Sequence, residues 1–221
     1  MLFRSIAIDG PAGSGKSTLG RMLARSLNLL YIDTGSMYRA VALAVIDTAL
    51  DPAGKNAVTE LAQRIDIDLE GDPDTLKVWL EGRDVTDRIR DEDITEMSSI
   101  VSTIPGVRRA MVARQRELGK RGAVMNGRDI GTVVFPDADI KFFLTAAPEE
   151  RAERRFKEDQ VVNSNATFAQ TFAEITERDR RDSTRADSPL KIADDAIVID
   201  STGLTIEATF DRMMEYVHRH H

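Results

Sequence analysis

The chain has 221 residues, which is enough for one sizeable core with an inserted subdomain. Its 37 acidic residues outnumber 30 basic ones, and the net charge of −7 argues against long DNA or RNA as a partner. No apolar run approaches the roughly 20 residues of a membrane span, and we expect no signal peptide. The lack of cysteine excludes disulfides and thiolate metal sites, and it fits a cytoplasmic protein.

Predicted strands and helices alternate along most of the chain, a pattern typical of a doubly wound parallel α/β sheet with right-handed crossovers. Apolar segments predict five strands, at 2–8, 29–33, 123–126, 140–144 and 196–200. Helical spacing of apolar residues predicts helices beginning near 16 and 148 and covering 36–50, 91–104, 107–118, 168–182 and 205–216. Polar or aperiodic stretches predict loops at 131–137 and 159–167. The chain contains no internal repeat, so we expect a single domain, 1–221, with insertions.

A glycine-rich motif separates the first strand from the first helix. Its spacing is G-x-x-x-x-G-K-[ST], the pattern of a phosphate-binding loop. The glycines allow successive amides to turn toward a phosphate chain, and the positive end of the helix dipole adds to the same anion site. Lys16 can reach the outer phosphates, and the hydroxyl of Ser17 or Thr18 can ligate Mg²⁺. A chance glycine-rich turn is the alternative, which the flanking strand and helix disfavour. We therefore predict a site for a nucleoside triphosphate at Gly10, Pro11, Ala12, Gly13, Ser14, Gly15, Lys16, Ser17 and Thr18.

Residues 64–90 break the alternation of strand and helix. Apolar residues there recur at every second position on either side of a Gly71–Asp74 turn, which predicts a short antiparallel meander. One face of this meander is too polar for full burial. We interpret the segment as an inserted flap, with a plain core hairpin as the alternative.

Arginine is more abundant than lysine, with 23 against 7 residues, and several arginines follow strand ends or lie on helices beside loops. Ligands of open α/β sheets bind outside the carboxyl ends of the strands. Arg178, Asp182 and Arg185 share one predicted helix face, and a second helix has arginines at i, i+3 and i+4. Either set alone fits a solvated face with ion pairs. Together with a phosphate-binding loop, they favour bidentate recognition of a second phosphate.

The sequence has no Ser-His-Asp set and no histidine outside its C-terminus. Its three histidines, His218, His220 and His221, fit a solvated end or a tag remnant better than a metal site. Phosphoryl transfer to a nucleoside monophosphate needs no general base, because the second pKa of a phosphate monoester is about 6. A guanine-reading Asn-Lys-x-Asp segment is also missing, which disfavours a GTPase.

Four segments resemble the bacterial cytidylate kinase family over nearly the whole chain. They are Ile8–Thr18, Asp33–Arg39, Gly127–Pro136 and Glu177–Asp182 with Arg185. The third is highly specific, since adenylate and shikimate kinases share the loop but lack that segment. The resemblance implies transfer of a phosphoryl group from ATP with Mg²⁺ to CMP or dCMP. It also implies a five-stranded parallel core, an enlarged monophosphate-binding flap at 64–90 and a mobile helical lid at 151–187.

The resemblance further implies roles for individual residues. The loop from Gly10 to Thr18 would bind the ATP phosphates, with Ser17 as the metal ligand, although the family pattern leaves Thr18 open. The catalytic residues would be Lys16, Arg128, Arg178 and Asp182. The CMP-binding residues would be Thr34, Tyr38, Arg39, Ser99, Arg108, Arg128, Asp129, Arg178, Asp182 and Arg185. Arg151, Arg154 and Arg155 would belong to the lid and bind ATP.

Two alternatives stay open on the sequence alone. One is a kinase for another small acceptor, such as UMP or shikimate. The other is a nucleotide-gated regulator that binds ATP without transferring phosphate. We expect a cytoplasmic monomer whose partners are ATP and CMP or dCMP, with no nucleic acid and no membrane.

Overall fold

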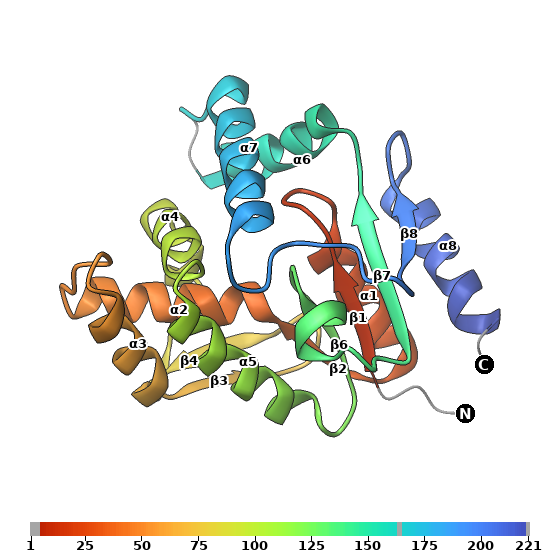
Figure 1. The fold of residues 1–221 in the computed structure, drawn as a ribbon. Coiled ribbons are helices and arrows are strands. Elements are labelled where there is room, and N and C mark those ends of the chain that lie inside the picture. The colour runs from red at the N-terminus through yellow and green to blue at the C-terminus, as the bar shows by residue number, and fades with distance from the viewer. Residues whose placement is uncertain (1–4, 163–164, 220–221) are drawn as a thin grey trace.

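A parallel sheet of five strands, in the order β2-β6-β1-β7-β8, forms the centre of the molecule (Figure 1). The structure is a computed structural model that describes residues 5–162 and 165–219. The strands are β1 Ser5–Asp9, β2 Leu30–Asp33, β6 Ala123–Asn126, β7 Ile140–Thr145 and β8 Ile197–Asp200. The predicted doubly wound five-stranded sheet is confirmed. The start of the strand predicted at 2–8 lies outside the described residues.

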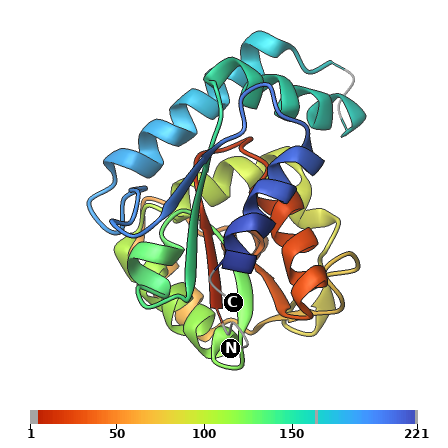
Figure 2. The same ribbon diagram turned by 90° about the vertical axis from the view of Figure 1, so that its right-hand side faces the viewer.

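Helices cover both faces of the sheet because its strands bury apolar side chains on both sides. On β1, Ile6 and Ile8 face one core cluster, which includes residues of α1 and α8, and Ala7 faces the other, built with residues of α2 to α5. Figure 2 shows α1 and α8 side by side on the first face. The helices of the two layers are α1 Lys16–Leu27, α2 Thr34–Asp47, α3 Lys55–Arg64, α4 Glu92–Val101, α5 Pro105–Gly119 and α8 Ile206–Arg219.

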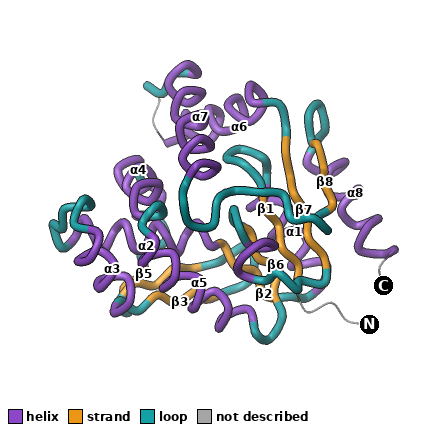
Figure 3. The backbone as a smooth tube through the Cα atoms, in the orientation of Figure 1, coloured by secondary structure: helices purple, strands orange, loops and turns teal. Residues whose placement is uncertain are grey.

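Two further helices, α6 (Pro148–Val162) and α7 (Phe168–Thr184), form a pair above the carboxyl ends of the strands (Figures 1 and 3). The prediction of a loop from 159 is wrong in its first part, since α6 continues to Val162. An ion pair of 2.8 Å between Arg155 and Asp159, one helical turn apart, supports this extension. Residues 163–164 of the predicted loop lie outside the described residues.

Helix α3 was not predicted from the sequence. Its apolar residues follow the i, i+3, i+4 pattern, because Val58, Leu61 and Ala62 are buried there. The helix occupies a stretch for which no element was predicted, between the second helix and the insert.

Two boundaries also differ from prediction. Pro105 does not separate α4 from α5 but occupies the first turn of α5, where its missing N–H costs nothing. The loop predicted at 131–137 begins with a π-helical turn, η2 (Ile130–Val134). The amides of Ile130 and Gly131 are bound by a distant carboxylate, a long-range contact that local sequence patterns do not reveal.

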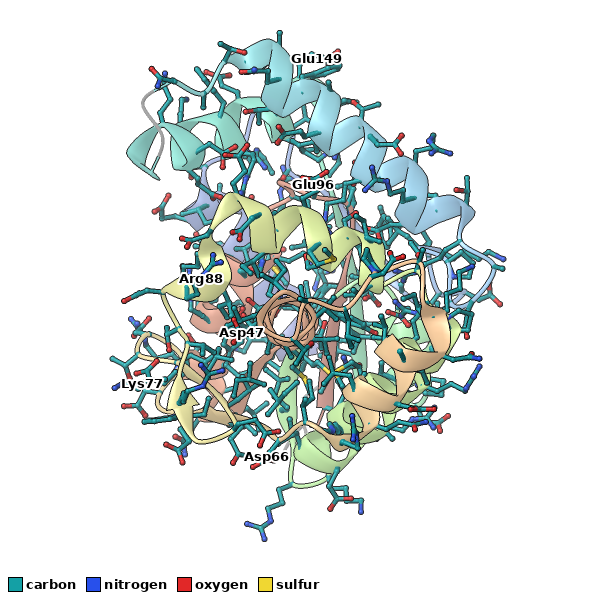
Figure 4. The ribbon with its side chains drawn as sticks, turned by 90° about the vertical axis from the view of Figure 1, so that its left-hand side faces the viewer. Asp47, Asp66, Lys77, Arg88, Glu96 and Glu149 are labelled. Atoms are coloured by element: carbon teal, nitrogen blue, oxygen red, sulfur yellow. The ribbon has the colours of Figure 1, made fainter. Side chains whose placement is uncertain are left out.

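The segment 64–90 forms the predicted antiparallel sheet, of three strands in the order β3-β4-β5. Its strands are β3 Ile67–Glu70, β4 Lys77–Leu80 and β5 Arg83–Asp84, followed by the 3-10 turn η1 Arg88–Arg90. Val78 and Leu80 are buried in the core cluster that also contains α2. Figure 4 views α2 from its end at Asp47, with Asp66 and Lys77 at the outer rim of the insert. The sheet is thus buried on one face and exposed on the other.

Over residues 5–162 and 165–219, no helix combines the length and the apolar character that a membrane span requires. His218 is exposed at the end of α8, whereas His220 and His221 lie outside the described residues.

Because the insert shares its core with α2, we expect it to unfold together with the main sheet. Leu80→Ala should lower the free energy of unfolding by about 2–5 kcal/mol, since Leu80 is 1% exposed. Urea denaturation followed by circular dichroism measures this change. Val198→Ala, at a side chain 50% exposed, serves as the control and should change stability by less than about 0.5 kcal/mol. A separate low-urea transition of the insert in the wild type would contradict the shared core.

Candidate active site

The phosphate-binding loop connects β1 to α1 and lies at the carboxyl edge of the sheet. Lys16 is buried in it, and its Nζ donates hydrogen bonds to the carbonyl of Pro11 (2.5 Å) and to the hydroxyl of Ser14 (3.2 Å). Burial, followed by repulsion from Arg128 and Arg178, holds the pKa of Lys16 well below its usual range. An anion placed beside this ammonium group would favour its charged form.

Two glycines let the loop pack tightly against its neighbours. Gly10 and Gly13 have φ angles of 146° and 70°, which L side chains rarely adopt. A Cβ at Gly10 would collide with the carbonyl of Leu144 at the end of β7, and one at Gly13 with the carbonyl of Arg151 in α6. The loop is therefore fixed between the sheet edge and the first turns of α6.

Three arginines from different elements approach one another in front of the loop. Arg39 lies on α2, Arg128 follows β6, and Arg178 lies on α7. Removal from water, followed by repulsion from Arg128 and Arg39, lowers the pKa of Arg178 to about 9. Burial also lowers the pKa of Arg39, and its Nε is buried without a hydrogen-bond partner among the described residues. The site thus concentrates positive charge that the described part of the chain does not neutralise, as an anion-binding site requires.

Asp182 on α7 neutralises part of this charge. Its carboxylate accepts hydrogen bonds from Arg128 Nε (2.7 Å) and Arg185 Nη1 (3.2 Å). Burial opposes ionisation of Asp182, but Arg128, Arg178 and Arg185 outweigh it and lower its pKa. The predicted common face of Arg178, Asp182 and Arg185 is therefore occupied by a buried network rather than by solvated ion pairs.

A second buried pair lies deeper, between α5 and the loop after β6. Arg108, 1% exposed, donates to Asp129 at 2.5 Å, and its guanidinium lies 5.4 Å from the ring centre of Tyr38. Burial opposes the charge on Arg108, yet Tyr38 and Asp129 raise its pKa overall. Burial raises the pKa of Tyr38 to about 12, so its hydroxyl stays protonated. Ser99 on α4 accepts a hydrogen bond of 3.2 Å from Arg181 instead.

The three arginines of α6 have different surroundings. Arg151 donates to the carbonyl of Ala12 (3.0 Å) and to Asp179 (2.5 Å), so it supports the phosphate-binding loop from behind. Arg154 donates to Ser201 (3.0 Å) and pairs with Glu150 on its own helix. Arg155 pairs with its own helix as well. These intrahelical pairs match the solvated-face alternative for Arg154 and Arg155 but not for the buried Arg151, and Arg155 also lines the cavity in front of the loop.

The cavity in front of the loop has a volume of about 230 Å³ and brings together most of the predicted site residues. Its walls include the loop from Ala12 to Thr18, together with Thr34, Tyr38, Arg39, Arg108, Arg128, Asp129, Arg155, Arg178, Asp182 and Arg185. Of the predicted residues, Gly10, Pro11, Ser99, Arg151 and Arg154 lie outside this lining. Arg154 lines a neighbouring cavity of about 320 Å³ that also borders the loop, beside Gly15 and Thr18.

Four polar residues of the site were not predicted. Asp9, Asp33 and Asn126 end the adjacent strands β1, β2 and β6, so their places at the carboxyl edge of the sheet are a signal that sequence reasoning could have used. Asp179 accepts from the amide of Ala12 at 2.9 Å, a contact across 167 residues that the sequence does not reveal.

The oxygen atoms beside Ser17 suit a hard divalent cation. Asn126 Nδ2 donates to Ser17 Oγ (3.3 Å) and to Asp33 Oδ1 (3.5 Å), so hydroxyl, carboxylate and amide lie together. The Oδ1 atom of Asn126 is buried and has no hydrogen-bond partner among the described residues. Mg²⁺ binds through a few protein oxygens, water and substrate phosphates, and therefore fits this group. The structure shows no cluster of three or more His, Cys, Asp or Glu side chains within its described ranges.

Comparison with known proteins agrees with this geometry. The family model described as cytidylate kinase matches residues 6–219. A cytidylate kinase of Desulforamulus reducens (strain ATCC BAA-1160 / DSM 100696 / MI-1) is 49% identical over 98% of this chain and 97% of its own. One of Solibacter usitatus (strain Ellin6076) is 48% identical over 96% of this chain and 91% of its own. A solved structure of an uncharacterized protein from Eubacterium ventriosum ATCC 27560 shares the fold, with a TM-score of 0.51 at 13% identity, covering 97% of this chain and 98% of the other. The chain therefore belongs to the cytidylate kinase family.

Proposed function

We propose that this chain transfers the γ-phosphoryl group of ATP to CMP or dCMP, giving ADP and CDP or dCDP, with the residues described above. The observation that most supports this reaction is the uncompensated positive charge in the cavity. Arg39 and Arg178 make no hydrogen bond or ion pair within the described residues, and both have lowered pKa values. They face the phosphate-binding loop across a cavity, so two phosphates bound on opposite sides would neutralise them.

The chemistry needs charge and position rather than a base. The acceptor phosphate has its second pKa at about 6, so its attacking oxygen is ionised at neutral pH. Lys16, Arg128 and Arg178 would neutralise the charge on the transferring group and hold donor and acceptor in line. Asp182 would hold Arg128 in place through its 2.7 Å hydrogen bond and contact the sugar hydroxyls together with Arg185.

Recognition of the acceptor base would depend on the buried pair of Arg108 and Asp129. A carboxylate oxygen can accept from the exocyclic amine of cytosine, which uracil lacks. Tyr38 would stack on the nucleotide, and Thr34 and Arg39 would line its phosphate. Ser99 would contact the base once its hydrogen bond from Arg181 is replaced by one with the nucleotide.

The donor side would consist of the loop from Gly10 to Thr18 and the arginines of α6. Bound Mg²⁺ would supply charge neutralisation at the donor phosphates, held by Ser17 and Asp33. Ser17 suits this role better than Thr18, because Thr18 is exposed while Ser17 accepts from Asn126. Arg154 and Arg155 line two cavities that both border the loop and would contact ATP from α6, with Arg151 fixing the loop itself.

We further propose that residues 151–187 act as a lid and that residues 64–90 act as a flap. No described residue of 64–90 lines the cavity, so the flap would act through α4, whose Thr95 and Ser98 do line it. Identical free and CMP-bound conformations would refute this movement. An enzyme that consumes ATP and CMP works where these nucleotides are made, so we place it in the cytoplasm. We also propose a monomer, because this chain by itself supplies both the phosphate-binding loop and the arginines that face it.

The proposed reaction is tested by coupled measurement of ADP release. Wild-type protein with ATP and Mg²⁺ should release ADP fastest when CMP or dCMP is added, more slowly with UMP or shikimate, and hardly at all without an acceptor. ADP release that responds to UMP or shikimate but not to CMP would favour the other acceptor kinase. Binding of ATP without acceptor-dependent release would favour a regulator.

Lys16→Ala should lower the turnover number by about 100-fold or more, because it removes a buried cation from the transferring phosphate. Steady-state kinetics with saturating ATP and CMP measure the change. Lys120→Ala, at an exposed side chain paired with Glu117, is the matched control and should keep wild-type turnover. Near-normal turnover of Lys16→Ala would exclude the role of the loop as the donor site.

Asp129→Asn should lower the preference for CMP over UMP by about tenfold or more, since a neutral amide is a poorer acceptor for the cytosine amine. The ratio of kcat/KM for the two acceptors, taken on one preparation, measures the preference. Loss of folded protein lowers both values equally and leaves the ratio unchanged. An unchanged ratio in active protein would show that another group reads cytosine.

A further inference from the structure

Asp9 is a buried carboxylate for which the proposed reaction has no use. It is the last residue of β1 and is only 4% exposed. Each of its oxygens accepts one backbone hydrogen bond, Oδ1 from the amide of Ile130 (2.8 Å) and Oδ2 from that of Gly131 (2.7 Å). Asp9 thus binds the start of η2, more than a hundred residues away along the chain.

These two bonds complete a pair of anchors around the acceptor-facing loop. At the start of this loop, before Arg128, the amide of Gly127 donates to the carbonyl of Ile8 at 2.9 Å. At its end, after Asp129, the Asp9 carboxylate accepts from the amides of Ile130 and Gly131. Arg128 and Asp129, which pair with Asp182 and Arg108, lie between the two anchors. The backbone positions of both side chains are therefore set by the end of β1.

The same strand end also sets the position of the donor loop. Gly10 follows Asp9 directly, and Lys16 lies close enough to Asp9 to favour its ionised form. A shift of the 127–131 loop relative to Asp9 is therefore a shift of the acceptor side relative to the donor side. Gly131 makes close contact possible here, because an added Cβ would lie 3.4 Å from Asp9 Oδ2 and 3.1 Å from Lys141 Cδ.

Stability does not account for an ionised carboxylate at this position. Burial raises the pKa of Asp9 to about 6, with the hydrogen bonds from Gly131 and Ile130 opposing the shift and Asp129 adding to it. Because the folded protein favours the neutral form, ionisation near neutral pH reduces stability instead of increasing it. What the ionised carboxylate supplies is a geometry: it has two acceptor oxygens, one for each of two adjacent amides.

We propose that Asp9 is a positioning residue for the acceptor nucleotide. Its carboxylate fixes the 127–131 loop so that Arg128 and Asp129 meet the acceptor phosphate and base at the correct distance from the donor loop. This inference rests on the proposed transfer of a phosphoryl group to CMP.

The test uses Asp9→Asn, which keeps the side-chain volume. An amide has one acceptor oxygen, and its NH₂ group would face the second backbone N–H, so one of the two bonds is lost. The KM for CMP should rise about tenfold and the CMP-over-UMP ratio of kcat/KM should fall about tenfold, while the KM for ATP changes less than about twofold. A purely structural role would reduce the amount of active enzyme, lowering kcat for both acceptors without changing KM or the ratio.

Asp139→Asn is the matched control, because Asp139 accepts from the amide of Ser5 (2.8 Å) at the opposite end of β1. It should keep wild-type KM values. Gly131→Ala is a second variant: its Cβ would crowd Lys141 Cδ at 3.1 Å and so shift the loop beside Asp9 slightly without removing the Asp9 charge, and it should change the KM for CMP in the same direction. This variant decides the question if Asp9→Asn does not fold.

Two outcomes would overturn the inference. If the wild type is active but the folded variant keeps its KM for CMP and its CMP-over-UMP ratio within about twofold, the positioning role of Asp9 is wrong and the proposed reaction stands. If the wild type releases no ADP in response to CMP, the proposed reaction fails, and this inference fails with it.

Discussion

The structure depends on holding more positive charge at one edge of the sheet than its own carboxylates neutralise. Lys16, Arg39 and Arg178 all have lowered pKa values there, because burial and mutual repulsion disfavour their charged forms. Buried charge without a partner lowers the stability of a fold. The remainder of the chain must therefore be stable enough to keep these groups together. A bound polyphosphate would offset part of the free energy that burying these charges costs. Affinity for nucleotides is in this sense built from the buried positive charge of the site.

The sheet provides this stability through its two buried faces. Apolar side chains of β1 alternate between the two core clusters, with Ile6 and Ile8 on one side and Ala7 on the other. The strands β1, β2 and β6 each end on a polar residue, at Asp9, Asp33 and Asn126. Apolar burial thus stabilises the frame, while the strand ends position the groups that contact ligands. The separation explains how a positively charged site and a stable core coexist in one small domain.

The sequence predicted the parts of this arrangement that depend on local pattern. The five strands, the phosphate-binding loop and the antiparallel insert all have a period or a motif, and the structure contains each of them. Less was predictable where a distant side chain decides the local structure. The start of η2 depends on Asp9, and the amide of Ala12 is bound by Asp179. The helix α3 is a different case. Its buried Val58 and Leu61 have helical spacing, so it was predictable from the sequence.

The net charge of −7 and the positive cavity act on different ligands. Exposed charges are screened beyond about 8 Å at physiological ionic strength, so a small nucleotide inside the cavity interacts with the nearby arginines and hardly with the acidic surface. A long nucleic acid would have to lie along that surface, where the repulsion acts over its whole length. The cavity also limits the size of its ligand, because α6 and α7 lie above the strand ends (Figure 3). An acidic exterior around a basic cavity is therefore compatible with a protein that binds mononucleotides.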